Sequence, residues 1–345
     1  MRADQFENFI ASSGEEAAAA ALSPFSCIYL SYAAIRPDFN VKSSASAETV
    51  GKIRRAAPKA KLVLTLGDRS PGGMDGFSDV AGSPPARAVF IRGLAAFLEK
   101  RGFDGVELYW DAPGSARSVG KNRPSDRSGL TAFVSELSEK TGGPISLRAQ
   151  ADAWWAECVD ISALRGFVGS WNILTDSFTG HWDTETKHIS NLRPSSYNPV
   201  AYKSLDIESV ITRFEEAGIP SGGLCFSYAA RGREFLGVFP HNNGLYQKFN
   251  IKDPSYWPGG LIPYSVLTEF YIGKNGFERF WDDDSYVPYL YNAETRAFIS
   301  YDDEDSLTAK AGFAKLKKTG GLICRDPFAD TENKLIKAYL AEYNK

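Results

Sequence analysis

Short apolar runs alternate with helix-like stretches along most of this 345-residue chain, and this alternation limits the possible folds more than any other feature. Seven runs are predicted strands: residues 27–32, 61–66, 105–110, 144–148, 169–174, 223–228 and 321–324. Between them lie stretches such as residues 87–100 and 206–217, whose apolar side chains recur at helical spacing. Strand then helix, repeated, predicts a parallel sheet covered by helices. An eighth strand could come from Gln5 to Ala11.

The alternation stops after Arg233. From residue 236 to residue 300 the sequence has turn pairs, alternating aromatic residues and three consecutive aspartates, which predicts an α+β insertion. The helical pattern returns at Ser306 and the last predicted helix covers residues 331–343.

Composition excludes several classes of protein. The formal net charge of −3 gives no basic field for nucleic acid, and no apolar run approaches the ~18 residues of a membrane span. Residues 1–5 lack the positive end and apolar core of a signal peptide, so we expect none in this chain. The 22 Phe, 16 Tyr and 7 Trp form either a thick core or stacking platforms for a ligand.

One predicted strand carries polar groups on a single face. Glu107, Tyr109 and Asp111 occupy alternate positions, so their side chains point to the same side of the strand. In a barrel that side is the interior, where a charge is costly unless the strand ends in a site.

This segment resembles the signature strand of glycoside hydrolase family 18, the chitinases and chitinase-like proteins, whose pattern is Asp-Gly-x-Asp-x-Asp-Trp-Glu-x-Pro. Asp104, Gly105, Trp110 and Pro113 match the pattern. Further segments are similar to the family, so that the resemblance covers roughly residues 25–330: residues 27–35, 101–105, 160–162, 175–182, 232–235, 301–306 and 320–321.

The resemblance implies a (β/α)8 TIM barrel with an α+β insertion domain between its seventh and eighth strands. Residues 1–235 and 301–345 would form the barrel, and residues 236–300 the insertion. The first strand of the family is divergent or missing: either Gln5 to Ala11 forms it, or the barrel is opened.

In this family, hydrolysis is assisted by the substrate, whose N-acetyl group attacks its own anomeric carbon. The resemblance implies a glutamic acid that protonates the leaving oxygen and an adjacent aspartate that orients the acetamido group. Here Asp111, one methylene shorter, stands at the position of the acid, and Glu107 and Tyr109 replace two aspartates. Tyr109 is not an anion at neutral pH because the reference pKa of tyrosine is about 10.

Two more segments depart from the family. Asp176 and Ser177 stand where the sixth strand has a Tyr-Asp pair, and Arg325 replaces the Trp under the sugar on the eighth strand. Each missing acid or orienting group costs about 10²–10⁴ in rate. We therefore predict a catalytically degenerate member in which no residue is catalytic.

The cation at position 325 suggests how the cavity beside Asp111 and Glu107 could be closed. Arg325 would reach Asp111 or Glu107 and plug the cavity; otherwise the pocket stays open. A separation above ~6 Å between the guanidinium and these carboxylates would refute the plug.

A glycan can be held without catalysis by aromatic rings and polar side chains. The ligand-binding candidates are Trp110, Trp182, Tyr228, Arg233, Tyr264, Trp281 and Arg325. Most aromatic residues of the insertion are expected to form its own core, because so short a segment barely sustains one.

The remaining reactive residues predict no metal and no cofactor. Three histidines and four cysteines are too scattered for a metal site, so we expect free thiols and hydrogen-bonded or solvated histidines. The acidic runs 282–284 and 302–305 lack the spacing of a calcium loop and are predicted turns and helix caps.

The combined prediction is a non-catalytic chitinase-like protein that binds chitin, chito-oligosaccharide or another glycan, or that acts as an interaction or growth-factor-like protein. The alternative is a weakly active or altered-specificity hydrolase of N-acetylglucosamine-containing glycans. A glycan or a protein is the expected partner. The resemblance implies an extracellular protein, whereas the predicted absence of a signal peptide leaves an intracellular location open.

Overall fold

The computed structural model describes residues 1–70, 72–196, 205–250 and 255–345. The chain forms two compact units, each assembled from two segments. The first consists of Met1–Ile173 and Arg213–Cys225, and the second of Leu174–Thr212 and Phe226–Lys345.

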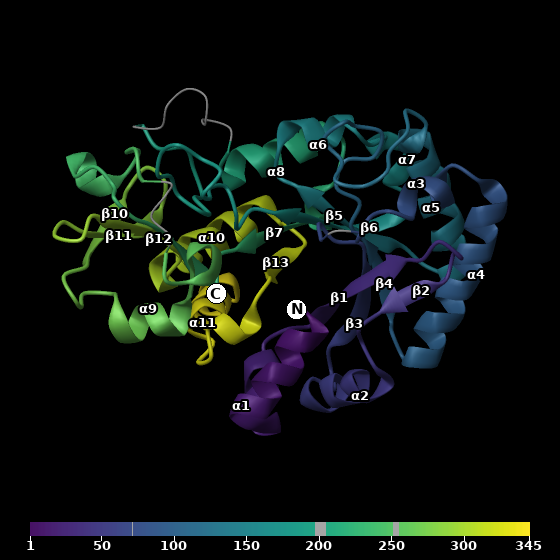
Figure 1. Cartoon of the computed structure of the whole chain (residues 1–345), viewed down its shortest axis with the longest axis horizontal. Helices are drawn as coiled ribbons and strands as arrows, with labels where there is room; N and C mark the ends of the chain where they lie inside the picture. Colours follow the sequence, from purple (N-terminus) through teal and green to yellow (C-terminus); the bar gives the residue numbers. More distant parts are fainter. Residues whose placement is uncertain (71, 197–204, 251–254) are drawn as a thin grey trace. The chain divides into compact units, whose positions relative to one another are not determined.

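Strands and helices alternate in the first part of the chain, as predicted (Figure 1). The strands are β1 (Cys27–Ile35), β2 (Val41–Ser43), β3 (Lys61–Leu66), β4 (Gly105–Leu108), β5 (Ile145–Gln150) and β6 (Val168–Leu174). The helices are α1 (Ala3–Leu22), α2 (Ala47–Ala56), α3 (Phe77–Ala81), α4 (Pro84–Arg101), α5 (Asp126–Thr141), α6 (Ala153–Glu157), α7 (Ile161–Leu164) and α8 (Ile207–Glu216).

The rest of the chain contains seven strands and three α-helices among its described residues. The strands are β7 (Leu224–Tyr228), β8 (Arg231–Phe235), β9 (Leu261–Pro263), β10 (Glu278–Asp282), β11 (Val287–Asn292), β12 (Ala297–Ser300) and β13 (Gly321–Cys324). The helices are α9 (Tyr264–Phe270), α10 (Glu304–Lys317) and α11 (Lys334–Tyr343). Short 3-10 turns are η2 (Ser221–Gly223), η3 (His241–Gly244), η4 (Pro258–Gly260) and η5 (Pro327–Ala329).

The larger sheet has eight strands in the order β13-β7-β6-β5-β4-β3-β1-β2. Parallel pairs join β1 to β3, β3 to β4 and β4 to β5, whereas β2 returns antiparallel to β1. All seven predicted strands are present in this sheet. With its helices, it is the fold of a (β/α)8 barrel that carries an insertion.

The expectation of a strand at Gln5 to Ala11 is wrong. Residues 1–26, all of them described, contain helix α1 and no named strand. The backbone N–H of Arg2 donates to Oε1 of Gln5 at 2.9 Å at the start of the helix. A kink at Gly14, whose φ is 87°, separates this first part from the alanine-rich second part. Phe6 and Ala18 are buried, so one side of the helix is packed. Only Arg2 forms a parallel bridge to β1, at Ser31.

Capping residues explain where the helices begin and end. Ser83 caps α4 through a bond from the N–H of Ala86, Pro84 occupies the first turn, and Gly102 ends the helix with a φ of 72°. Helices α3, α4 and α5 pack against one another in the first unit (Figure 1).

The predicted α+β insertion contains a second, antiparallel sheet in the order β10-β11-β12-β8-β9, with α9 beside it. Its core contains Phe235, Val238, Tyr289, Tyr291 and Phe298. The sheet includes β8, so it begins before residue 236, where we placed the start of the insertion. The rings of Tyr289 and Tyr291 are core residues, as expected for most insertion aromatics.

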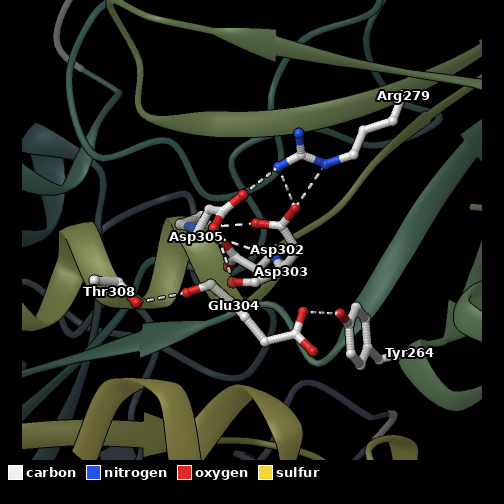
Figure 2. Close-up of polar contacts among 8 residues, drawn as sticks. Tyr264, Arg279, Asp302, Asp303, Glu304, Asp305 and Thr308 are labelled. Carbon is white, nitrogen blue, oxygen red and sulfur yellow. Dashed lines mark hydrogen bonds and ion pairs between the residues drawn. The ribbon is translucent and has the colours of Figure 1, made fainter. Parts of the chain in front are cut away.

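The acidic runs form turns and caps, as predicted. Asp303 is the N-cap of α10 and accepts the N–H of Ser306 at 3.0 Å. Figure 2 shows the Arg279 guanidinium donating to both Asp303 and Asp305, while the Tyr264 hydroxyl donates to Glu304. Asp282 accepts the N–H groups of Asp284 and Ser285 in the turn after β10.

Candidate functional site

The polar face of β4 lies next to a second polar face, on β5. Glu107 is in register with Ser146, and Leu108 with Leu147. Tyr109 and Asp111 follow the last residue of β4, at the carboxyl end of the strand. This is the end at which barrel enzymes place their sites.

The Glu107 carboxylate is fully buried and has three polar partners, of which one is a cation. Arg148 on β5 approaches Oε2 to 2.6 Å, and the Thr65 hydroxyl donates to the same oxygen at 2.7 Å. The Asn172 amide on β6 donates to Oε1 at 2.7 Å. A buried charge requires such partners. The carboxylate is thus a fixed member of the barrel interior.

Tyr109 is held between two β5 side chains. The Gln150 amide donates to its hydroxyl at 2.6 Å, and the Arg148 guanidinium lies 5.4 Å from its ring centroid. A cation over an aromatic face is an attractive contact. The ring is 6% exposed, so it fills the position where the family pattern has an aspartate.

Asp111 is fully buried beyond the end of β4. Gln150 donates to Oδ1 at 3.1 Å, and the Arg69 guanidinium lies 3.7 Å from Oδ2. Oδ2 has no hydrogen-bond partner among the described residues. Burial raises the pKa of Asp111, and Arg69 and Gln150 oppose that rise only in part. Asp111 therefore keeps its proton to a higher pH than a solvent-exposed aspartic acid does.

Asp104, which matches the family pattern, lies apart from Glu107, Tyr109 and Asp111. It precedes β4, where its carboxylate accepts the N–H of Leu62 and the Arg54 guanidinium, both at 2.7 Å. Asp104 thus ties β4 to β3 and α2 and does not join the Glu107 cluster.

In the second unit, Arg325 follows β13 and pairs with Asp176. Its guanidinium lies 3.2 Å from Oδ1 of Asp176 and 3.4 Å from the Ser177 hydroxyl. Ser227 on β7 also donates to Asp176, at 2.7 Å. The structure thus brings these three predicted positions together. A contact of Arg325 with Asp111 or Glu107 would join the two units and stays a prediction.

Trp182 and Arg233 form a second group in the same unit. The Trp182 ring is 67% exposed, and the Arg233 guanidinium lies 5.5 Å from its centroid. Arg233 on β8 is 7% exposed and donates to the carbonyl oxygen of Gly259 at 2.5 Å. The cation–π contact with Arg233 holds the indole of Trp182, most of which is exposed to solvent.

The other aromatic candidates are less accessible. Trp110 is 3% exposed and packs on Phe77 at 5.3 Å, while Tyr228 is 1% exposed. Tyr264 is buried with its hydroxyl on Glu304. Trp281 on β10 is half-buried beside Arg279, 5.4 Å from its guanidinium.

Sequence reasoning missed the partners of the signature strand. Arg148, Gln150 and Asn172 hold Glu107, Tyr109 and Asp111 in place. Their signal was present in the chain, because Ser146, Arg148 and Gln150 alternate with apolar residues on β5. That alternation places polar groups on the interior face of a second strand.

The four cysteines, His181 and His188 are as expected for free thiols and hydrogen-bonded histidines. All four cysteines are free. His181 bonds the Glu234 carbonyl, and His188 bonds Asp282 at 3.0 Å. No cluster of potential metal ligands occurs among the described residues. Within the same residues, no helix has the length and hydropathy to cross a bilayer.

Comparison with known proteins agrees with the signature strand. The profile of the family "Glycosyl hydrolases family 18" matches residues 6–324. The chain is 30% identical over 290 residues to Chitinase A1 of Niallia circulans, covering 79% of this chain and 41% of the relative. It is 25% identical over 293 residues to Chitotriosidase-1 of Mus musculus, covering 79% of this chain and 59% of the relative. The chain thus spans about half the length of these curated relatives.

Solved structures with the same fold include a chitinase and YKL-39. Chitinase ChiA74 from Bacillus thuringiensis superposes with a TM-score of 0.83 at 23% identity, covering 94% of this chain and 66% of that one. YKL-39, determined in the presence of chitooligosaccharides, has a TM-score of 0.79 at 19% identity, covering 95% and 94% of the two chains.

Proposed function

Because this chain belongs to glycosyl hydrolase family 18, we propose that it is a member that binds a glycan without hydrolysing it. Chitin and chito-oligosaccharides are the expected ligands. The proposal concerns this chain and not a longer protein with further domains.

The arrangement of Glu107, Tyr109 and Arg148 carries the proposal. Substrate-assisted hydrolysis needs a carboxylate beside the acid to orient the acetamido group and to balance its developing charge. Here the residue beside Asp111 on that face is Tyr109, whose hydroxyl is bound by Gln150. The nearest carboxylate on β4, Glu107, is engaged by Arg148 at 2.6 Å. Neither group is free to take that part.

A glycan ligand is supported by the family and by an accessible ring. The chain resembles YKL-39, a protein whose structure was determined with chitooligosaccharides. Trp182 offers an exposed indole, and such a ring packs on the apolar C–H face of a sugar.

Asp111 favours a second candidate function, hydrolysis with altered specificity. It is buried, and burial raises its pKa, as a proton donor near neutral pH requires. The named curated relatives are chitinases. A shorter acid would act only on a substrate that approaches closer than the family substrate does.

Calorimetric titration with chitotetraose tests the binding proposal. We expect saturable binding that Trp182→Ala weakens about tenfold, equivalent to about 1.4 kcal/mol. Phe239→Ala, which removes another exposed ring, is the matched control and should leave the affinity unchanged. Absence of binding at millimolar ligand would contradict the proposal and favour a role as an interaction or growth-factor-like protein.

A fluorogenic chitobioside assay separates binding from hydrolysis. The unmodified protein should release no product above the buffer rate, and an active chitinase serves as the positive control. Product release that disappears in Asp111→Asn would establish the hydrolase instead.

The proposal includes an extracellular location, as the family resemblance implies. Fractionation of the source cells should recover the protein outside them. Recovery from the cytosol alone would contradict this part.

A further inference from the structure

A pocket of about 510 Å³ lies in the first unit. None of its lining residues contacts Glu107, Tyr109 or Asp111 through a hydrogen bond or ion pair described above. Its walls come from the turn between β1 and β2, helix α3, the start of α4 and the loop between β4 and α5. Such strand-to-helix loops form the ligand-binding face of a barrel. The volume is in the range of small-ligand sites.

The apolar wall consists of Phe39, Pro85, Ala86 and Val89. Val89 is 51% exposed, a large fraction for a valine on a helix. Phe39 has a φ of 59°, a left-handed conformation that is unfavourable for a bulky side chain. A ring held at a cost in this turn lines the pocket, where an apolar ligand face can cover it.

The polar wall consists of Asp79 and Arg123. The Arg123 guanidinium donates to Asp79 at 2.6 Å and to the Ser78 carbonyl oxygen at 2.8 Å. Ser78 is fully buried and donates to buried Asp126 at 2.9 Å. Ser78 and Asp79 therefore hold the Arg123 guanidinium in place at the wall of the pocket.

From these walls we infer a second binding site, for one or two units of a neutral sugar. The lining carries one carboxylate and one guanidinium, which pair with each other, and Lys121 donates to the same carboxylate at 2.7 Å. Because the carboxylate is already paired, the pocket does not need a charged ligand. A neutral polyol satisfies both groups, because its hydroxyls donate to the carboxylate and accept from the guanidinium. The apolar face of the same sugar covers Phe39 and Val89.

The test is site-resolved NMR of the whole chain titrated with chitobiose and, in parallel, with cellobiose. We expect at least one sugar to shift the amide resonances of Gly82, Ala86 and Ser125 saturably at millimolar concentration. Phe39→Gly removes the ring and suits the positive φ, so the fold should be retained while the affinity falls at least tenfold.

Val89→Asp provides a second variant, because it places a charge in the apolar wall at an exposed helix position. It should also weaken the shifts at least tenfold. Leu316→Asp, an exposed aliphatic position on another helix, is the control and should change nothing.

Two results would overturn the inference. One is the absence of saturable shifts at Gly82, Ala86 and Ser125 with both sugars. The other is shifts that persist in Phe39→Gly and Val89→Asp. Loss of chitotetraose binding in Trp182→Ala with the Gly82 shifts intact would support two separate sites. The amide shifts therefore test this pocket, and the calorimetric titration tests the proposed function.

Discussion

At the scale of single residues, the interior of the barrel is determined by charge compensation. Glu107 is fully buried, and Arg148 is 13% exposed at 2.6 Å from it. Removing one partner of such a pair is far more costly than removing both, because the remaining charge keeps its desolvation penalty.

We therefore predict that Arg148→Met destabilises the chain by about 3–5 kcal/mol in urea unfolding. The double variant Glu107→Gln, Arg148→Met should regain most of that loss. A double variant no more stable than the single one would show that Arg148 acts through packing on Tyr109 instead.

Asp111 gives a pH prediction of definite sign. Burial raises the pKa of Asp111 in the folded chain above the usual aspartate pKa of 3.8. Between these two pKa values the native state therefore binds more protons than the unfolded state. Stability from this group is present below pH 3.8 and is lost as the pH rises. Relative to the unmodified chain, Asp111→Asn should gain stability between about pH 3.5 and pH 7. Urea unfolding at both pH values measures it, and a relative loss would mean that the Arg69 contact outweighs burial.

The sequence predicted the residues of the signature strand but not their partners. Spacing shows that Glu107, Tyr109 and Asp111 share one face. It does not show that β5 presents Arg148 and Gln150 to that face, because strand register is set by tertiary pairing.

At the scale of elements, prediction succeeded where burial produces a continuous apolar run. Seven of the eight strands of the main sheet were predicted; β3 is such a run, whereas β5 alternates apolar and polar residues. Gln5 to Ala11 was misassigned because its few apolar residues fit both a strand and one face of a helix. The alanine tract lies beyond a kink at Gly14, so it does not decide the conformation of these residues.

Helix α10 allows a prediction about capping. Asp303 both caps the helix and accepts two Arg279 bonds, at 2.9 and 2.6 Å. Asp303→Ala should cost about 1–3 kcal/mol, since it removes a cap and a partly buried charge pair. Asp303→Asn keeps the capping oxygen and should cost less in thermal unfolding. Equal costs would assign the effect to the Arg279 pair alone.

At the scale of the whole molecule, periodicity predicted the parallel sheet and the insertion, and the family resemblance implied the barrel, but neither predicted the division into units. The second unit combines Leu174–Thr212 with Phe226–Lys345, and the intervening residues belong to the first. Such a partition depends on contacts between segments distant in the chain, which local patterns do not encode. The antiparallel sheet likewise recruits β8, which the resemblance had placed in the barrel.

Ligand binding should be visible in the unfolding of the whole chain. A glycan that binds only the native state stabilises it by RT ln(1 + [L]/Kd), or about 1.4 kcal/mol for each tenfold rise in concentration above the Kd. We predict that the melting temperature rises with the logarithm of chitotetraose concentration, and that Trp182→Ala shifts this rise to about tenfold higher concentration. Scanning calorimetry with lactose as the control measures it. An equal rise with lactose would mean that the sugars act as osmolytes, because stabilisation by exclusion from the surface requires no site.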